Sequence, residues 1–275
     1  MRVEPSGQAC GATVTGVDLT GPLDAATIAA IRAAWLDHQV LAFPDAGLDD
    51  DGLERFSRGF GNFGEDPFIA PIPGRKHILA VKREADETSP LFAENWHSDW
   101  SFLDNPPSAT VLHGRVIPPV GGDTLFANQY AAYDALPDAT KVRIDTMQAW
   151  HSAARGYAPD GMYGENDKGR SMSIRPSVEA RKRRAQPMVR VHPETGRKAL
   201  FVNPGYTCGV VDMDEDAGWT FLVELFQHQV EERFQYRHVW APDMLVMWDN
   251  RCLLHRATGG YEGYARVLHR TTVAG

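Results

Sequence analysis

The chain has 275 residues, of which 43% are hydrophobic and 23% charged, an ordinary composition for a folded protein with one large domain. The formal net charge of −8 argues against general nucleic-acid binding, and no signal-peptide core or apolar run of roughly 18 residues predicts export or a membrane span. Three widely spaced cysteines (Cys10, Cys208, Cys252) fit neither a disulfide framework nor a zinc ribbon, so we expect a cytoplasmic protein. The basic run 181–184 is interpreted as a solvated face, with a polyanion site as the alternative.

The first third of the chain predicts short strands and two capped helices. Asp24 precedes apolar residues at helical spacing and predicts a helix that runs to about His38. Asp50 or Asp51 is expected to cap a second helix. Strands are predicted over 12–19, 39–45 and 77–84, with a glycine- and proline-rich loop over 61–75.

The remaining two thirds predict further short strands and few helices. Residues 130–150 are predicted to be helical with a break at Pro137, and Asp214 or Asp216 precedes another helix. Strands are expected over 95–102 and 110–117, around the turn PETG in 189–203, and over 243–258 and 259–274, which a glycine loop joins.

Many short strands with few helices indicate a mainly β sandwich or barrel with flanking helices, in a single domain over 1–275. A doubly wound α/β sheet requires regular strand–helix alternation, which this chain lacks. Residues 151–187 are polar and glycine-rich, and such long loops are often functional. We therefore expect an active-site lid or insertion there.

The stretch NWHSDWSF contains a candidate metal site. On a strand, His97 and Asp99 would point the same way because strand side chains alternate between faces. His255 is the best third ligand, since it follows an apolar strand and lies among polar residues, and His269 is its rival. Two histidines and one carboxylate leave metal positions open, as in non-heme iron(II) oxygenases, whereas structural zinc sites close with four ligands.

Two arginines near the C-terminus form a candidate anion site. Arg266 and Arg270 are four residues apart, which places both on one face of a strand. Buried guanidiniums need anionic partners, and a bidentate arginine is suited to a carboxylate. Thr124, after a glycine turn, would complete a carboxylate pocket. The alternatives are two exposed arginines and an ordinary strand threonine.

Taken together, NWHSDWSF, GGDTLF, WDNRCLLHRAT and YARVLHRTTV resemble the taurine dioxygenase / 2,4-dichlorophenoxyacetate dioxygenase (TauD/TfdA) family. The resemblance covers nearly the whole chain. It implies a double-stranded β-helix, or jelly roll, and a dioxygenase that uses Fe(2+), 2-oxoglutarate and O2. It also implies a homodimer or homotetramer.

The resemblance assigns roles to individual residues. It implies that His97, Asp99 and His255 bind the catalytic iron, and that Thr124 and Arg266 hold the distal carboxylate of 2-oxoglutarate. Because Asp99 is present where halogenating relatives lack the carboxylate, hydroxylation is the expected reaction.

The resemblance also suggests the substrate residues. Arg270 would face the acidic group of a small anionic organic substrate, such as an aryloxyalkanoate or a sulfonate. Asp66 lies where taurine-type members place a histidine, and an aspartate would repel a sulfonate. Taurine itself is therefore not expected, and Asp66 would favour an additional amine or hydroxyl on the substrate. Trp100 and Tyr206 are further candidate substrate residues, and the hydroxylated product is one that can break down into a carbonyl compound and an acid.

Two other classes of function remain open at this stage. A divalent-metal jelly-roll hydrolase or isomerase would use the same His–Asp–His set without 2-oxoglutarate, and would not need Arg266 or Thr124. A non-catalytic binding protein on the same scaffold would tolerate loss of the metal ligands. The paired arginines favour the oxygenase.

Overall fold

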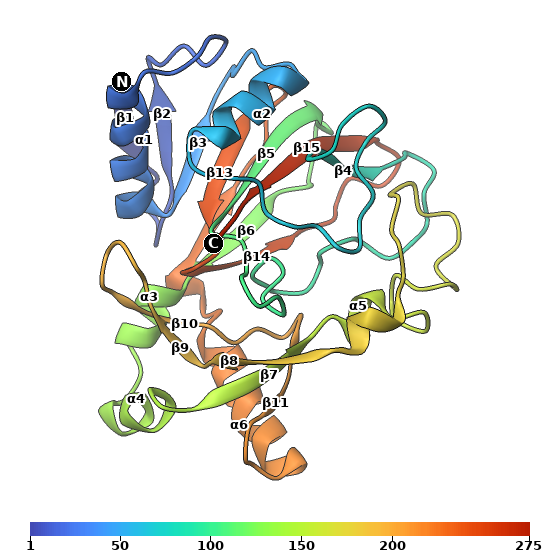
Figure 1. Ribbon diagram of the computed structural model, residues 1–275. Helices are drawn as coiled ribbons and strands as arrows, with labels where there is room; N and C mark the ends of the chain where they lie inside the picture. The colour runs from blue at the N-terminus through green and yellow to red at the C-terminus, as the bar shows by residue number, and fades with distance from the viewer.

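The computed structural model describes all residues, 1–275, and its main element is a seven-stranded sheet. Only the β2–β3 pair is parallel. Figure 1 shows this sheet across the upper part of the molecule. Its strands, in spatial order, are β1 (Arg2–Pro5), β2 (Ala12–Thr15), β3 (Val40–Phe43), β13 (Leu245–Asp249), β5 (Ala109–Val116), β15 (Arg266–Val273) and β4 (Leu79–Arg83).

Smaller sheets form the second layer. Buried side chains of β6, including Phe126, pack against the inner face of the large sheet, so the two layers enclose a common core. This mainly β, two-layered arrangement confirms the predicted jelly roll. The smaller sheets are β12 (Gln235–His238), β6 (Thr124–Asn128) and β14 (Leu253–Ala257); β11 (Thr207–Val210), β7 (Gln148–Ser152) and β8 (Arg183–Pro187); and β10 (Lys198–Leu200) with β9 (Val189–Val191).

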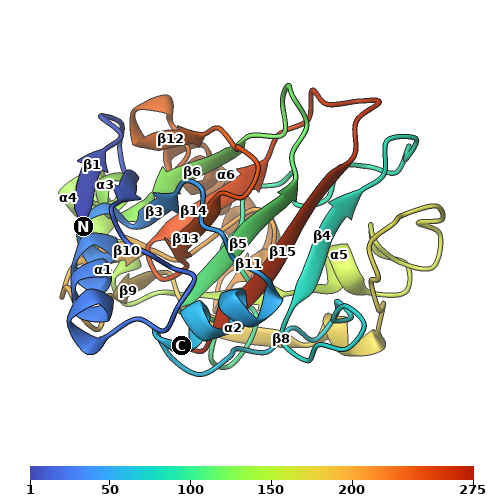
Figure 2. The same ribbon diagram turned by 90° about the horizontal axis from the view of Figure 1, so that it is seen from above.

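Two helices cover the outer face of the large sheet, as Figure 2 shows from above. They are α1 (Ala25–His38) and α2 (Asp50–Arg58). The Asp24 carboxylate accepts a hydrogen bond from the Thr27 N–H at 2.7 Å, as expected for an N-cap. The second cap is Asp49 and not the predicted Asp50 or Asp51, because the Asp49 carboxylate accepts from the Gly52 N–H at 2.7 Å.

The remaining helices are short except α6 and lie on the second layer. The Asp214 carboxylate caps α6, as predicted. No helix is long and apolar enough to cross a bilayer. These elements are α3 (Gln129–Asp134), α4 (Asp138–Ile144), α5 (Ala154–Tyr157) and α6 (Glu215–His228), with 3-10 turns at Val178–Arg181 and Glu232–Phe234.

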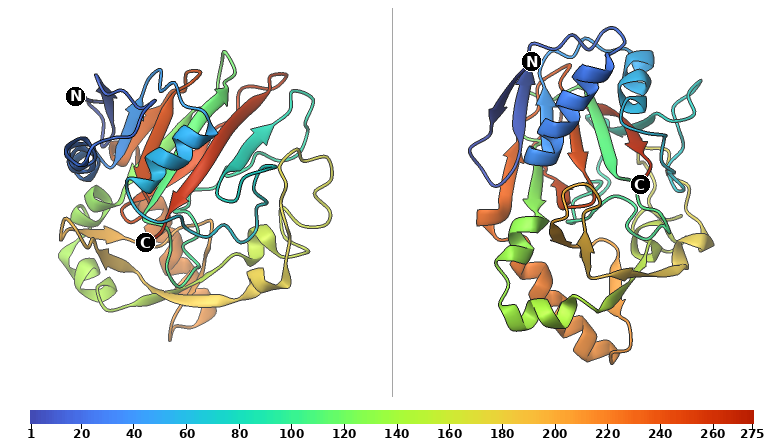
Figure 3. Two further views of the ribbon diagram at one scale, coloured as in Figure 1. Left: turned by 45° about the horizontal axis from the view of Figure 1, so that its top comes forward. Right: turned by 60° about the vertical axis from the view of Figure 1, so that its left-hand side comes forward.

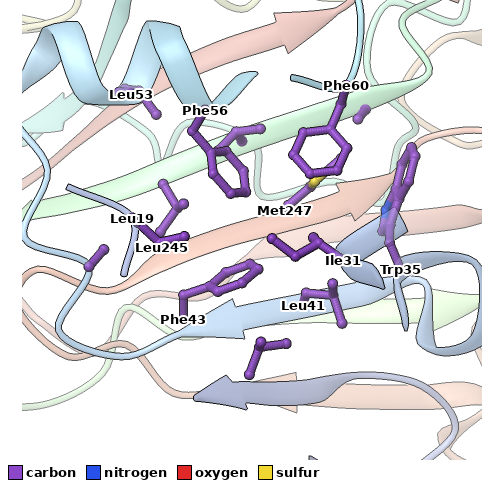
Figure 4. Close-up of a cluster of buried hydrophobic side chains, with 14 of the residues drawn as sticks. Leu19, Ile31, Trp35, Leu41, Phe43, Leu53, Phe56, Phe60, Leu245 and Met247 are labelled. Carbon is purple, nitrogen blue, oxygen red and sulfur yellow. The ribbon is translucent and has the colours of Figure 1, made fainter. Parts of the chain in front are cut away.

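The strands of the large sheet carry apolar side chains on both faces. On β3, Leu41 and Phe43 pack against α1 and α2, whereas Val40 and Ala42 face the second layer. Figure 4 shows the outer cluster, in which Phe56 and other residues of the helices meet the sheet. Because both faces of the sheet are covered, most side chains that face the second layer are apolar. The candidate site is formed at the few positions on that face that carry polar side chains.

Residues 95–102 do not form the predicted strand. His97 makes a single antiparallel bridge with His255, and the chain then turns through Trp100, whose φ is 46°. The Leu103 N–H donates to the Trp100 carbonyl at 2.9 Å and closes this turn. The prediction of a strand was wrong, although His97 and Asp99 still converge because the turn brings the carboxylate back toward the bridge.

Two other boundaries differ from the predictions. The segment 243–258 contains two strands, β13 and β14, in different sheets, because Asp249 accepts from the Arg251 N–H at 2.9 Å and forms a turn. The predicted helix over 130–150 ends at Ile144, and β7 begins at Gln148.

Candidate metal centre and substrate cavities

Two histidines and one aspartate converge between the layers. His97, Asp99 and His255 are buried, and their donor atoms all lie within 4.8 Å of one another. The Asp99 Oδ1 atom is 3.6 Å from His97 Nε2 and 3.9 Å from His255 Nε2. The bridge between His97 and His255, with N–H to carbonyl distances of 3.0 and 2.8 Å, fixes the two backbones relative to each other.

Each imidazole is oriented by its surroundings. His97 Nδ1 lies 2.8 Å from the Asn95 carbonyl, so it carries the proton and Nε2 presents a lone pair. The His255 ring packs against Trp248 with a centroid distance of 4.6 Å, and burial lowers its pKa to about 3. A neutral imidazole with a free nitrogen is the form that binds a metal. Gly205 lies against His97, since a Cβ at position 205 would be 2.8 Å from the His97 Cβ.

A chain of hydrogen bonds holds the Asp99 carboxylate. The Thr110 hydroxyl donates to Asp99 Oδ2 at 2.6 Å and accepts from Asn250 Nδ2 at 2.9 Å, and Trp248 Nε1 donates to Asn250 Oδ1 at 2.9 Å. Burial opposes ionisation of Asp99, but the positive charge of Arg270 holds its pKa well below the usual range. An ionised carboxylate facing two imidazole nitrogens matches the ligand set of a 2-His-1-carboxylate centre.

A cavity beside these residues contains an unpaired cation. This metal-side cavity is lined by His97, His255, Thr124, Arg266 and Arg270, among others. Arg266 is 6% exposed, its Nε has no hydrogen-bond partner, and its guanidinium forms no ion pair. Burial lowers the pKa of Arg266 to about 10. The Thr124 hydroxyl also lines the cavity and accepts from Trp240 Nε1 at 3.0 Å, which leaves its own proton free to donate.

Arg270 differs from Arg266 because carboxylates already surround it. Its Nη2 donates to Asp66 Oδ1 at 2.7 Å, and its Nη1 lies 3.5 Å from Asp99 Oδ1. The Asp66 carboxylate also accepts from Trp100 Nε1 at 2.6 Å. Neither Asp66 nor Trp100 lines a cavity at this site. Their assignment as substrate residues remains a prediction. Asp66 binds Arg270, Trp100 and Thr272, and the Trp100 ring packs among aromatic side chains that include Tyr206.

A second cavity, here called the aromatic cavity, adjoins the first and shares Phe92, Ala93 and His97 with it. Tyr206 lines the aromatic cavity, and this position is compatible with its predicted contact with the substrate. Its other lining residues were not predicted, because they lie on loops and on the four-residue helix α5, which have no periodic pattern. These residues are Asn95, Arg155, Gly156, Tyr157, Met162, Tyr163 and Gly205.

The segment 151–187 includes β8 and α5, and it contributes Arg155, Tyr157 and Tyr163 to the aromatic cavity and Arg170 to the metal-side cavity. Figure 3 shows its loop beside the loop that follows β4. Two hydrogen bonds join these loops. Arg170 Nη2 donates to the Pro90 carbonyl at 2.9 Å, and the Ser171 N–H donates to the Glu87 carboxylate at 3.0 Å. A lid that moves remains a prediction.

Two other histidine sites are excluded as metal centres by their contacts. His192, Asp249 and Cys252 are close together, but His192 Nδ1 accepts from the Glu194 and Thr195 N–H groups at 3.2 Å and its Nε2 lies 3.0 Å from Asp249. Both ring nitrogens are therefore satisfied. His269, the rival third ligand, bonds to Asp50 at 2.7 Å, away from the convergence point.

Comparison with known proteins agrees with this geometry. The family described as "Taurine catabolism dioxygenase TauD, TfdA family" matches residues 2–272. The (S)-phenoxypropionate/alpha-ketoglutarate-dioxygenase of Delftia acidovorans is 34% identical over 286 residues, which cover 100% of this chain and 95% of the relative.

Two solved structures have the same fold over the whole chain. A putative alpha-ketoglutarate-dependent taurine dioxygenase from Burkholderia xenovorans superposes with a TM-score of 0.83 at 30% identity, covering 100% of this chain and 92% of the other. AAD-2 in complex with Mn(II) and N-oxalylglycine superposes with a TM-score of 0.81 at 29% identity, covering 100% and 97%. This chain therefore belongs to the TauD, TfdA family and is a dioxygenase that depends on iron(II), 2-oxoglutarate and dioxygen.

Proposed function

We propose that the enzyme hydroxylates a C–H bond of a small organic acid, with 2-oxoglutarate bound by Arg266 and Thr124 next to a metal held by His97, Asp99 and His255. One observation carries the assignment of the 2-oxoglutarate site. The Arg266 guanidinium is buried, has no anionic partner, and lines the same cavity as the two histidines. An unpaired buried cation is costly unless a ligand supplies the negative charge.

The side chains fit both absent groups. The two Nε2 atoms and Asp99 Oδ1 form a three-donor set with room for further ligands, which suits iron(II). The distal carboxylate of 2-oxoglutarate suits a guanidinium with a free Nε and a hydroxyl with a free proton. Gly122 leaves space for this, since a Cβ there would lie 3.1 Å from Arg266 Nε.

In this assignment iron(II), with 2-oxoglutarate and dioxygen, supplies the oxidising chemistry for hydroxylation. The protein's own groups position the metal ligands and 2-oxoglutarate and exclude water. Thr110 and Arg270 hold the Asp99 carboxylate, and the Asn95 carbonyl holds the tautomer of His97. Arg266 and Thr124 fix the far end of 2-oxoglutarate, so that its other end meets the metal. Aromatic walls of the adjoining cavity exclude water from the reacting carbon.

The substrate class follows from the relatives and from the shape of the site. The relative from Delftia acidovorans is named for a phenoxypropionate, and the family is named for taurine catabolism. Phe92, Tyr157, Tyr163 and Tyr206 favour an aryl or other apolar body on the substrate. Breakdown of the hydroxylated product, a homodimer or homotetramer, and a cytoplasmic location remain predictions.

A metal-dependent hydrolase or isomerase on the same scaffold is not favoured. Such an enzyme could use the His–Asp–His set, but it would gain nothing from a buried unpaired guanidinium at Arg266. The family match and the named relatives are dioxygenases.

The direct test is substrate-stimulated formation of succinate. The purified protein is loaded anaerobically with iron(II) and 2-oxoglutarate and is then exposed to oxygen with aryloxyalkanoates, sulfonates, alkyl sulfates or amino acids. We expect one class of organic acid to raise succinate, and we expect His97→Ala and Arg266→Ala to abolish the increase. Succinate that rises equally in Arg266→Ala would contradict the assigned 2-oxoglutarate site.

A further inference from the structure

We propose that the acidic group of the primary substrate binds Arg155, at the rim of the aromatic cavity, and that Arg270 instead positions the metal-binding aspartate. The inference rests on the proposed function, because it assumes an organic acid whose reactive carbon lies near His97. It reverses the expected orientation of the substrate, since the acid then points away from Arg270.

Arg270 has little positive charge left for a further anion. Its guanidinium donates to Asp66 at 2.7 Å and lies 3.5 Å from Asp99, so one cation faces two carboxylates. Thr272 Oγ1 and Trp100 Nε1 also donate to Asp66, at 3.1 and 2.6 Å, and hold that carboxylate in place. A third anion at Arg270 would meet the negative charges of both carboxylates at close range.

Arg155 is an exposed arginine whose charge is not paired. It lines the aromatic cavity, where no acidic side chain is present. Its Nη1 donates to the Pro204 carbonyl at 3.0 Å, and its guanidinium lies 5.5 Å from the Trp219 ring, but it forms no ion pair. These contacts hold the guanidinium without neutralising it, so its charge is available to an oxyanion.

A groove next to the aromatic cavity adds further positive charge. Arg155, Gly205 and Tyr206 line both spaces, and the groove adds Arg183, which has no ion-pair partner, and Arg181, which pairs with Asp160 at 2.6 Å. Arg181 and Arg183, from the basic run 181–184, thus provide part of a positive rim on a chain with net charge −8. Such a local potential draws small anions toward the entrance of a site.

The residues that line the aromatic cavity indicate the kind of uncharged body that the ligand carries. Tyr157 and Tyr163 form an aromatic pair with centroids 5.4 Å apart, and Tyr206 lies edge-on to His97 at 5.8 Å. His97, Arg155 and these rings line the same cavity, so an apolar body bound there would contact the rings. The ligand class is therefore a singly charged oxyanion, either carboxylate or sulfonate, on an aryl or short alkyl body.

Binding to the iron(II)- and 2-oxoglutarate-loaded enzyme, measured anaerobically by calorimetry, tests the assignment. The probes are 2-phenoxypropionate, its uncharged amide, and hexanesulfonate, of which the two anions distinguish a carboxylate from a sulfonate. We expect Arg155→Gln to weaken binding of at least one anion by about 10- to 100-fold and to leave binding of the amide unchanged. Arg184→Gln is the charge-matched control, because Arg184 pairs with Asp104 at 2.6 Å and lies off both spaces.

A second variant tests the role given to Asp66. Asp66→Asn should release charge on Arg270, so the double variant Asp66→Asn/Arg155→Gln should regain affinity for the anions relative to Arg155→Gln alone. Equal anion affinity in wild type and Arg155→Gln would overturn the assignment. Titration of 2-oxoglutarate in the same samples separates the two proposals, since wild-type protein that fails to bind 2-oxoglutarate would overturn the proposed function instead.

Discussion

The Thr110 hydroxyl donates to Asp99 Oδ2 at 2.6 Å, and this leaves Oδ1 as the oxygen that faces both histidine Nε2 atoms. Because outer contacts of this kind orient metal ligands, Thr110→Val is expected to lower the affinity for iron(II) or Mn(II) by about 10- to 100-fold. The measurement is an anaerobic metal titration followed by calorimetry.

Thr271 offers a matched control on the same sheet. Its hydroxyl lies 2.6 Å from Ser57 Oγ in a buried contact outside the metal site. Thr271→Val should reduce the free energy of unfolding by about 1 kcal/mol and leave the metal affinity unchanged. An unchanged metal affinity in Thr110→Val would show that Thr110 does not orient the carboxylate.

Arg266 should reduce the stability of the ligand-free protein. Its guanidinium is buried without an ion pair, so Arg266→Met is expected to raise the free energy of unfolding without ligand by about 1 kcal/mol. The same variant should lose the increase in melting temperature that 2-oxoglutarate gives the wild type, since only a protein that binds a ligand is stabilised by it. Thermal melts with and without 2-oxoglutarate measure both effects.

The control for this variant is Arg197→Met, because Arg197 is an exposed arginine that pairs with Asp134 at 3.2 Å. It should retain the full stabilisation by 2-oxoglutarate. If Arg266→Met also retained that stabilisation, the distal carboxylate would bind elsewhere.

The convergence of His97, Asp99 and His255 could be predicted from the sequence, although the backbone that holds them could not. His97 and Asp99 were expected on a strand, and they converge instead across a bridge and a turn through Trp100. A turn with positive φ at tryptophan has no local signal, because tryptophan shows no preference for that conformation. The even spacing of Arg266 and Arg270 did predict their shared inward face, since β15 is a regular strand.

The partners of these residues could not be predicted, because they come from distant parts of the chain. Asp66 meets Arg270 across 204 residues, and Thr110 and Asn250 meet across 140. The sequence could not indicate that Asp66 faces a guanidinium. Its expected contact with the substrate therefore rested on alignment through a loop, where register is poorly defined.

Gly205 is expected to be necessary for metal binding. A methyl group at this position would lie 2.8 Å from the His97 Cβ and 3.3 Å from the Trp96 carbonyl oxygen, so one of them must move. Gly205→Ala should lower metal affinity by about 10-fold, because His97 would leave its position relative to Asp99. Gly209→Ala is the control, since the nearest atom to its Cβ would be 3.8 Å away. Equal metal affinities in the two variants would refute the steric argument.

His151 should make the metal-free protein sensitive to acid. Its ring is buried between Ser101 Oγ at 2.9 Å and Thr207 Oγ1 at 3.2 Å, and burial lowers its pKa to about 3. In the unfolded chain the pKa is about 6.5. Between pH 6.5 and pH 3, His151 is therefore protonated in the unfolded chain but not in the folded protein. The free energy of unfolding falls as the pH falls through this range, by up to about 1.4 kcal/mol per pH unit from this residue.

His151→Gln tests this contribution, because glutamine keeps a polar side chain without a titrating group. The variant should be less stable than the wild type at pH 7, and the difference in free energy of unfolding should shrink as the pH is lowered through 6 and 5. Leu222→Ala, a change in an apolar cluster, should show a difference that is constant with pH. Urea denaturation at each pH supplies the free energies. A constant difference for His151→Gln would mean that the folded protein accepts the proton on His151 as readily as the unfolded chain does.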